Sequence, residues 1–317
     1  EVVEALARRG ITDTPFQTLA YQQAWWTHLH PGNGRLHTVT VRNDEQELLA
    51  IACLYNLDGA LYFNGCVEET DYLDLIATAE HAETAWQAVL DCLCRPDFPE
   101  WQSLDLCNVP EASPTRSILS QEAQRRGFLF RENINEVCPV IELADTFEGY
   151  LDSIDSKQRR EIQRKLRRAE AAEAEMVVVG PDDDVHTAVA DFLDLLQKST
   201  FEKRDWLNDG RRAVFYDAAR AAHKAGTLQL IFIEVRGKKA AALFNFDYKG
   251  RIWVYNSGLD PALFGALSLG VVITAKAIEY AVENGRTTFD FLRGNETYKY
   301  RFGAADTRIY RLHLERN

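Results

Sequence analysis

The sequence has no long apolar run. The longest candidate, LGVVITAKAI at 269–278, is interrupted by Lys276, and nothing approaches the roughly 20 apolar residues that a membrane helix needs. No signal peptide is recognisable at the start, although Glu1 is not an initiator residue. We therefore expect a cytoplasmic protein without a membrane span.

Positive charge is in short supply. The chain has 36 lysines and arginines against 48 aspartates and glutamates, which gives a formal net charge of -12. Proteins that bind nucleic acids broadly need a basic surface to hold the phosphate backbone. The charge balance argues against a nucleic-acid partner, and an anionic ligand would have to meet a local basic patch.

Cysteines in a metal-binding arrangement are also missing. All six lie in the first half of the chain and none has the spacing of a zinc-ligand pair, so we expect no metal. They occur in apolar strand or helix contexts, where a free thiol behaves as a small hydrophobic side chain. The sequence predicts reduced thiols at all six positions: Cys53, Cys66, Cys92, Cys94, Cys107 and Cys138.

What the chain does contain is a globular composition, with 46% hydrophobic and 26% charged residues over 317 positions. This length suits one large domain or two ordinary ones. The second half has three β-rich runs, then a helix that starts after Ser268 and stops at Asn284-Gly285, then a last strand. The order predicts an antiparallel meander, a crossover helix and a strand parallel to the third. The four strands are expected at 228–235, 239–248, 252–258 and 287–292.

The first half repeats this order. Its fold class is therefore predicted to be the same: α/β, with a mixed sheet in each of two tandem units. We place the boundary near residue 145, which gives units at 1–145 and 146–317. The strands of the first unit are expected at 36–42, 47–56, 60–65 and 101–107, and its helix at 79–94.

A strongly helical stretch, YLDSIDSKQRREIQRKLRRAEAAEAE, lies between the units at 150–175. On a helical wheel its cations gather on one broad face, opposite a narrow apolar face of Ile162, Leu166 and Ala169. Such a face is either solvated surface or the local basic patch for an anionic ligand, and both interpretations stay open. The cations are Lys157, Arg160, Arg164, Lys165, Arg167 and Arg168.

The second-half pattern also predicts a place for a phosphate group. A crossover helix between parallel strands turns its free amides and the positive end of its dipole toward a crevice. Here the helix is preceded by FGALSLG at 264–270, where Gly265 and Gly270 permit close backbone approach and Ser268 supplies a hydroxyl. Glycine and serine are common at helix starts, so these residues alone are weak evidence for a phosphate site. The position of the segment in the strand order is what supports the site.

These segments resemble a known family. YNSGLDP (255–261), LSLG (267–270) and FDFLRGNETYKYRFG (289–303) are similar to the CelD/BcsL-type acetyltransferases, in the FemAB-like branch of the acyl-CoA N-acyltransferase (GNAT) superfamily. FQTLAYQQAWW, AIACLY and DYLDL extend the resemblance over nearly the whole chain. It implies tandem GNAT units and acetyl-CoA as co-substrate, although relatives commonly have Ser-Pro-Gly at 268–270. The implied cofactor contacts are Asn256, Ser257, Gly265, Leu267, Ser268, Leu269 and Gly270.

The last of these segments offers groups for acyl transfer, which needs a held donor, a deprotonated nucleophile, a stabilised oxyanion and a proton for the leaving group. Lys299 would lie near the donor carbonyl or a phosphate. Tyr298 or Tyr300 would protonate the leaving thiolate. We expect replacement of Lys299 to abolish turnover and to leave the fold intact.

Charged neighbours in the same segment have two interpretations. Asp290 or Glu296 would act as a base or orient the acceptor, and Arg293 would clamp an anionic group. In the structural interpretation, Asp290 pairs with Arg293 or caps a turn. Tyr298, Tyr300 and Phe302 would then alternate as packed strand residues.

The resemblance places the acceptor between the meander and the helices before it, where Arg204 and Trp206 would offer a cation and a flat apolar face. Arg160 and Arg164 would contact a phosphate of the acceptor. The leading hypothesis is acetyl transfer to an amine or hydroxyl of a carbohydrate or cell-envelope precursor. The alternatives are a Fem-like aminoacyltransferase that uses aminoacyl-tRNA, and a non-catalytic binding module. The first unit lacks the charged aromatic ending, so we expect it to be structural or acceptor-binding.

Overall fold

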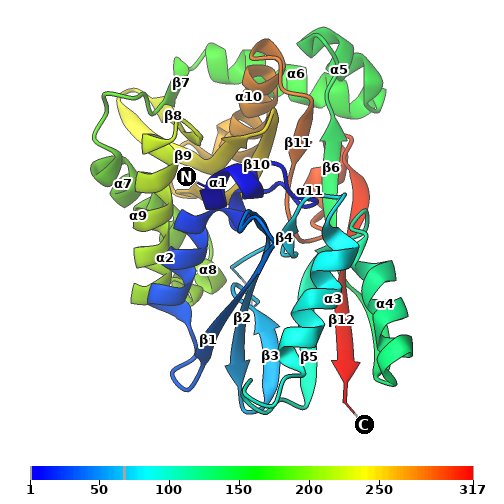
Figure 1. Cartoon of the computed structure of the whole chain (residues 1–317). Coiled ribbons are helices and arrows are strands. Elements are labelled where there is room, and N and C mark those ends of the chain that lie inside the picture. Colours follow the sequence, from blue (N-terminus) through cyan, green and yellow to red (C-terminus); the bar gives the residue numbers. More distant parts are fainter. Residues whose placement is uncertain (1, 67–68, 317) are drawn as a thin grey trace. The chain divides into compact units, whose positions relative to one another are not determined.

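The structure is a computed structural model that describes residues 2–66 and 69–316. The chain forms two compact units, one from Glu1–Val137 with Thr307–Asn317 and the other from Cys138–Asp306. Each contains the predicted meander, crossover helix and parallel strand, so the expected α/β class is confirmed (Figure 1).

The units differ from the predicted ranges at both ends. Residues 138–142 of β6 (Leu129–Glu142) belong to the second unit, because they pair antiparallel with β11 (Thr288–Asp290). Most of the last strand, β12 (Ala305–Glu315), returns to the first unit, where it pairs antiparallel with β5 (Ser103–Pro110). Sequence order alone did not indicate this exchange, because the pairing partner of β12 lies some two hundred residues upstream.

The first unit has the strand order β1-β2-β3-β5-β12-β6, with β4 added beside β2. β3 and β5 run parallel and flank the crossover helix α3 in sequence, as predicted. Trp86 of α3 is fully buried under this sheet. The remaining elements are α1 (Val2–Ala7), η1 (Pro15–Gln17), α2 (Leu19–Leu29), β1 (Arg35–Arg42), β2 (Leu48–Leu57), β3 (Ala60–Phe63), β4 (Ile76–Ala77), α3 (Ala82–Leu93) and α4 (Thr115–Arg126).

Cys66 and Cys107 form a disulfide, with their Cα atoms 5.8 Å apart. The expectation of six reduced thiols is therefore wrong for this pair. Cys66 follows β3 and Cys107 lies on β5, and these two strands are neighbours in the sheet although the cysteines are 41 residues apart. Cysteine spacing along the chain could not show that proximity. Cys53, Cys92, Cys94 and Cys138 are free thiols.

The second unit has the strand order β6-β11-β10-β9-β8-β7. Helices cover both faces of this sheet, as two adjacent residues of β9 show. Leu243 packs in one cluster with α10. Phe244 packs on the other face, where the rings of Phe192 on α7 and Phe215 on α9 lie 5.5 and 5.4 Å from its ring. The elements are α5 (Phe147–Ser153), α6 (Ser156–Glu170), β7 (Ala174–Val178), α7 (Val185–Ser199), α8 (Phe201–Trp206), α9 (Asp209–Lys224), β8 (Leu228–Val235), β9 (Lys238–Tyr248), β10 (Arg251–Leu259), η2 (Gly265–Leu267), α10 (Leu269–Glu283), β11 and α11 (Thr297–Arg301).

Two neighbouring strands of the second unit diverge. β10 and β11 pair in parallel only from Arg251–Thr288 to Trp253–Asp290. Beyond that point β10 continues to Leu259, whereas β11 ends. Past Trp253, β10 therefore has no paired strand on the β11 side among the described residues. Its backbone is bonded to helices there instead, because Lys203 donates to the Ser257 carbonyl and the Leu259 amide donates to Ser199 Oγ.

The aromatic stretch after Gly294 is not a strand. Residues 297–301 form the short helix α11, and Phe302 is its C-cap. The interpretation of Tyr298, Tyr300 and Phe302 as alternating strand residues is therefore wrong. The helix keeps Phe302 buried, with its ring 6.3 Å from that of Phe291, while Tyr298 and Tyr300 are 40% and 38% exposed.

No helix among residues 2–66 and 69–316 combines the length and apolar character that a bilayer span requires.

Candidate active site

A cavity of about 520 Å³ lies in the second unit where β10 and β11 diverge. Its wall comes from β9, β10, the loop before α10, the start of α10, Phe291 and α11. Five of the predicted cofactor-binding residues line it together: Ser257, Gly265, Ser268, Leu269 and Gly270.

The other two predicted contacts lie elsewhere. Leu267 is 8% exposed and packs in the core beside α10. The side chain of Asn256 accepts a hydrogen bond from the Ser257 amide at 2.9 Å and so shapes the end of β10. These two residues support the wall of the cavity, and the structure does not bring their side chains to its lining.

One part of the cavity wall, at the start of α10, suits an anion. Phe264 and Ser268 both have left-handed backbone conformations, with φ of 51° and 56°, on either side of η2. This folds the loop so that α10 begins at the cavity wall, where its free amides and dipole favour an anion. Lys165 of α6 also lines the cavity, and its ammonium lies 3.2 Å from the Glu161 carboxylate. Most of the remaining wall is apolar.

Lys203 is a site residue that the sequence did not single out. Its Nζ donates hydrogen bonds to the carbonyl of Ser257 at 2.5 Å and to the Ser257 hydroxyl at 3.1 Å. Burial lowers the pKa of Lys203 to about 8, against a smaller opposing effect of the Glu296 carboxylate. The sequence pointed to Arg204 instead, but α8 turns that side chain to solvent, with its guanidinium 4.9 Å from the Phe201 ring. The choice between two adjacent cations depends on which one faces β10, and only the fold decides this.

Lys299 is held on every side by the protein. Its Nζ donates to the carbonyl oxygens of Leu292, Arg293 and Gly294 at 3.2, 2.7 and 3.0 Å. The Glu296 carboxylate lies 2.8 Å from the same nitrogen, and only 3% of the Lys299 side chain is exposed. This geometry ties the turn after β11 to α11, and makes Lys299 a positioning residue for that turn.

Asp290 and Tyr298 flank the same turn. The Asp290 carboxylate accepts a hydrogen bond from the Leu292 amide at 2.7 Å, and Leu292 has a left-handed φ of 57°. Tyr298 lines the cavity, with its ring edge-on to that of Phe291 at 5.9 Å. Desolvation of its hydroxyl, together with the nearby Glu296, raises the pKa of Tyr298. The phenol therefore keeps its proton near neutral pH and can serve as a hydrogen-bond donor.

The predicted acceptor residues are outside this cavity. Arg160 is exposed on α6, and Arg164 makes a two-bond pair with Glu161 at 3.0 and 2.9 Å. Trp206 is half-buried, its ring edge-on to that of Phe215 at 6.3 Å, with the Arg211 guanidinium 4.8 Å from its centre. Arg293 is half-buried in the turn that Lys299 holds.

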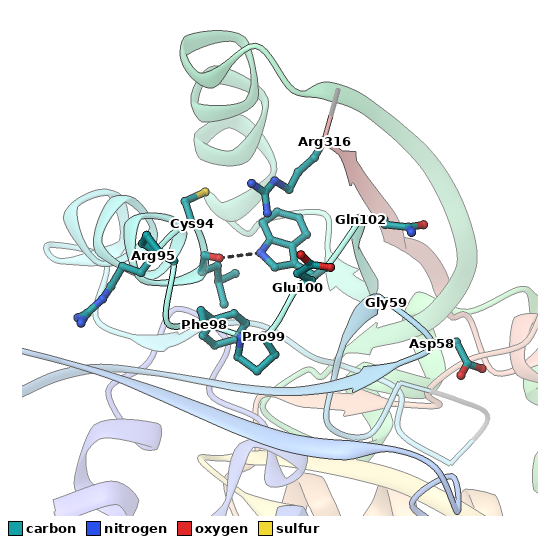
Figure 2. Close-up of a pocket in the computed structure, with 12 residues that line it drawn as sticks. Asp58, Gly59, Cys94, Arg95, Phe98, Pro99, Glu100, Gln102 and Arg316 are labelled. Atoms are coloured by element: carbon teal, nitrogen blue, oxygen red, sulfur yellow. Dashed lines mark hydrogen bonds between the residues drawn. The ribbon is translucent and has the colours of Figure 1, made fainter.

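Described residues of the first unit also line hollows. One, of about 560 Å³, lies near Trp101, whose indole donates to the Leu93 carbonyl at 2.7 Å while the Arg316 guanidinium lies 5.1 Å from the ring centre (Figure 2). Another, of about 480 Å³, lies beside α2 and is lined in part by Trp26 and Asn64. The acceptor-binding role expected for the first unit stays a prediction.

No group of three or more His, Cys, Asp or Glu side chains is arranged to hold a metal ion within 2–66 and 69–316.

Comparison with known proteins identifies the fold. The family described as "Acetyltransferase (GNAT) domain" matches residues 156–300. FemX is similar over 98% of this chain and 94% of its own, with a TM-score of 0.69 and 10% identity. L-PGS from Bacillus licheniformis is similar over 99% and 90%, with a TM-score of 0.63 and 10% identity. A conserved protein of unknown function from Bacteroides thetaiotaomicron VPI-5482 is similar over 98% and 97%, with a TM-score of 0.61 and 13% identity. No curated protein sequence matches.

These likenesses define the class of structure: a mixed α/β protein of GNAT-type fold, whose second unit contains the segment that matches the GNAT family model. At such low identity the solved structures establish the fold alone.

Proposed function

We propose that the protein is an acyltransferase of the CelD/BcsL type. It takes acetyl from acetyl-CoA and transfers it to an amine or hydroxyl of a carbohydrate or cell-envelope precursor, with the chemistry in the second unit. The observation that supports this most is the cavity at the divergence of β10 and β11, where five predicted cofactor residues converge.

Different residues in and around the cavity would have different roles in acyl transfer. The start of α10 and Lys165 would hold the phosphates of the donor, and the end of β10 that lines the cavity would align the thioester arm. The Tyr298 phenol would donate a hydrogen bond to the departing thiolate. Lys299 and Asp290 would act indirectly, by fixing the turn that carries the wall residue Phe291 toward α11.

Calorimetric titration with acetyl-CoA tests the donor site. Wild-type protein should bind it, and Ser268→Glu should weaken binding by at least about tenfold, because a carboxylate at the start of α10 repels the donor phosphates. Ser117→Glu, on the exposed surface of α4 in the first unit, is the matched control and should bind normally. A folded wild-type protein that binds no acetyl-CoA would overturn the proposed donor.

The second candidate function is aminoacyl transfer from tRNA, by analogy with the Fem-like enzymes. The basic face of α6 favours it: Lys157, Arg160, Arg167 and Arg168 are exposed, and none has an ion-pair partner in the part of the chain that the structure describes. Unpaired cations in a protein of net charge -12 are free to meet phosphates.

The double variant Arg160→Gln with Arg168→Gln separates the two donors. If the donor is an aminoacyl-tRNA, filter binding should show weaker tRNA binding and a slope of log affinity against log salt smaller by roughly 1.5, the loss of two phosphate contacts. Arg220→Gln, which removes an exposed arginine paired with Asp217, is the control. No tRNA binding by the wild type would remove this candidate. A non-catalytic module would instead bind a donor without ever cleaving it.

A further inference from the structure

Lys203 is one hydrogen bond away from the lining of the donor cavity, which makes it a candidate proton acceptor if the function proposed above holds. The side chain starts on α8, on the α7 and α9 side of the sheet, and reaches Ser257 at the end of β10. Ser257 in turn lines the donor cavity. Lys203 thus connects the donor cavity with the helices that precede the meander, which is the side from which an acceptor was expected.

The hydrogen bonds of Lys203 suit an uncharged amine. An ammonium group has three N–H donors, and a neutral amine keeps two donors and gains a lone pair. The Ser257 carbonyl and hydroxyl use two donors. Loss of one proton therefore preserves both bonds and leaves a lone pair that can accept a proton. Lys299 is different, because three carbonyl groups and Glu296 surround its nitrogen.

Few charges oppose deprotonation of Lys203. Its neighbours on α8, Glu202, Arg204 and Asp205, are exposed. On α7, Lys198 and Asp194 pair with each other at 2.6 Å. From the segment after β11, Glu296 acts on Lys203 but is itself paired with Lys299, and the α11 phenol of Tyr298 is neutral near pH 8. Because few charges oppose deprotonation, burial lowers the pKa of the Lys203 amine to a value near the pH of the reaction.

We propose that Lys203 is the general base of acyl transfer. The acceptor's N–H or O–H proton passes to the lone pair of Lys203 Nζ while the acceptor atom forms its bond to the acyl carbon. The carbon–sulfur bond breaks, its electron pair leaves with the CoA sulfur, and the resulting thiolate takes a proton from solvent through the Tyr298 hydroxyl. Lys203 then returns its proton to solvent, so the net products are acylated acceptor and free CoA.

The rate of acetyl-CoA cleavage against pH tests this assignment, with water as acceptor and free CoA quantified by chromatography. In the wild type the rate should rise about tenfold per pH unit up to about pH 8 and then level off, following the neutral fraction of Lys203. Lys203→Arg retains the charge and the donors to Ser257 but cannot lose its proton. It should lower the plateau by about 100-fold or more and remove the inflection. Lys198→Arg, on the neighbouring helix, should leave the profile unchanged.

A purely structural role predicts the reverse, namely that Lys203→Arg keeps both the wild-type rate and the inflection. That result would overturn the assignment of Lys203 as the base and would leave the proposed function standing. Wild-type protein that binds acetyl-CoA in calorimetry but cleaves none at any pH would overturn both. Competitive labelling of folded full-length protein with acetic anhydride gives a readout independent of turnover. Reactivity of Lys203 with a midpoint near pH 8 supports the proposal, and a midpoint above pH 10 contradicts it.

Discussion

Lys299→Met should abolish acyl transfer and also lower the free energy of unfolding by about 3 kcal/mol, the scale expected when buried carbonyl acceptors lose a charged donor. The substitution leaves the carbonyl oxygens of Leu292, Arg293 and Gly294 without their shared donor, and leaves Glu296 without its counter-ion. Buried acceptors that lose their partners cost about 1–3 kcal/mol each unless water replaces the donor. The turn after β11 should then loosen and move Phe291 and α11 from the cavity wall.

Urea denaturation and a thioester-cleavage assay on the same preparation check this expectation. Lys276→Met is the matched control, because Lys276 is 40% exposed on α10 and pairs with Glu279 in the i,i+3 position. It should change stability by less than about 0.5 kcal/mol. The sequence had suggested that Lys299 acts on the substrate and that its loss spares the fold. Unchanged stability with lost turnover would restore that catalytic interpretation.

The strand order of the second unit was predictable from the sequence because two independent local signals agree there. Apolar runs give the strands, and Arg236-Gly237 and Lys249-Gly250 give the turns between β8, β9 and β10. All four turn residues have left-handed backbone conformations, with φ from 52° to 73°. Consecutive left-handed residues define the tight hairpin turn whose twist matches the strands.

The location of the cavity at the end of β10 was predictable for a related reason. A helix that follows the third strand of a meander must begin at the carboxyl end of that strand. Ser268, Leu269 and Gly270 therefore had to lie beside the end of β10, and they do line the cavity. Individual catalytic roles do not follow from topology. Lys203 and Arg204 are adjacent in sequence and chemically alike, and only the rotation of α8 distinguishes the cation that meets Ser257 from the one in solvent.

Features that depend on contacts distant in sequence were missed. The disulfide between Cys66 and Cys107 requires knowing that β3 and β5 are neighbours, and the place of β12 requires its pairing with β5. The α11 helix was missed because five residues are too few for periodicity to separate helix from strand. Unlike the disulfide and β12, this helix is held by nearby residues, because the Lys299 ammonium donates to the carbonyl oxygens of Leu292, Arg293 and Gly294.

Gly258→Ala should lower the free energy of unfolding by about 3 kcal/mol, near the upper end of overpacking costs. A Cβ at this position would lie 2.6 Å from the Leu196 nitrogen and 2.8 Å from the Leu195 carbonyl carbon, so the clash is with the backbone of α7. Backbone atoms of a packed helix cannot rotate away as a side-chain end can, so α7 must move off β10. That movement would also strain the hydrogen bond from the Leu259 amide to Ser199 Oγ, now 2.7 Å, which joins the two elements.

Ligand binding should weaken together with stability, because Gly258 and its neighbour Ser257 both line the cavity. We expect acetyl-CoA binding by Gly258→Ala to weaken by at least about tenfold in calorimetry at a temperature where the variant is still folded, since a small displacement of positioning groups is costly. Gly32→Ala is the control: a Cβ there meets nothing within 4 Å, so stability and binding should both be unchanged. A Gly258→Ala protein of wild-type stability would mean that α7 yields to the methyl group at little cost. In that case the contact between α7 and β10 does not position Ser257 for Lys203 and the donor.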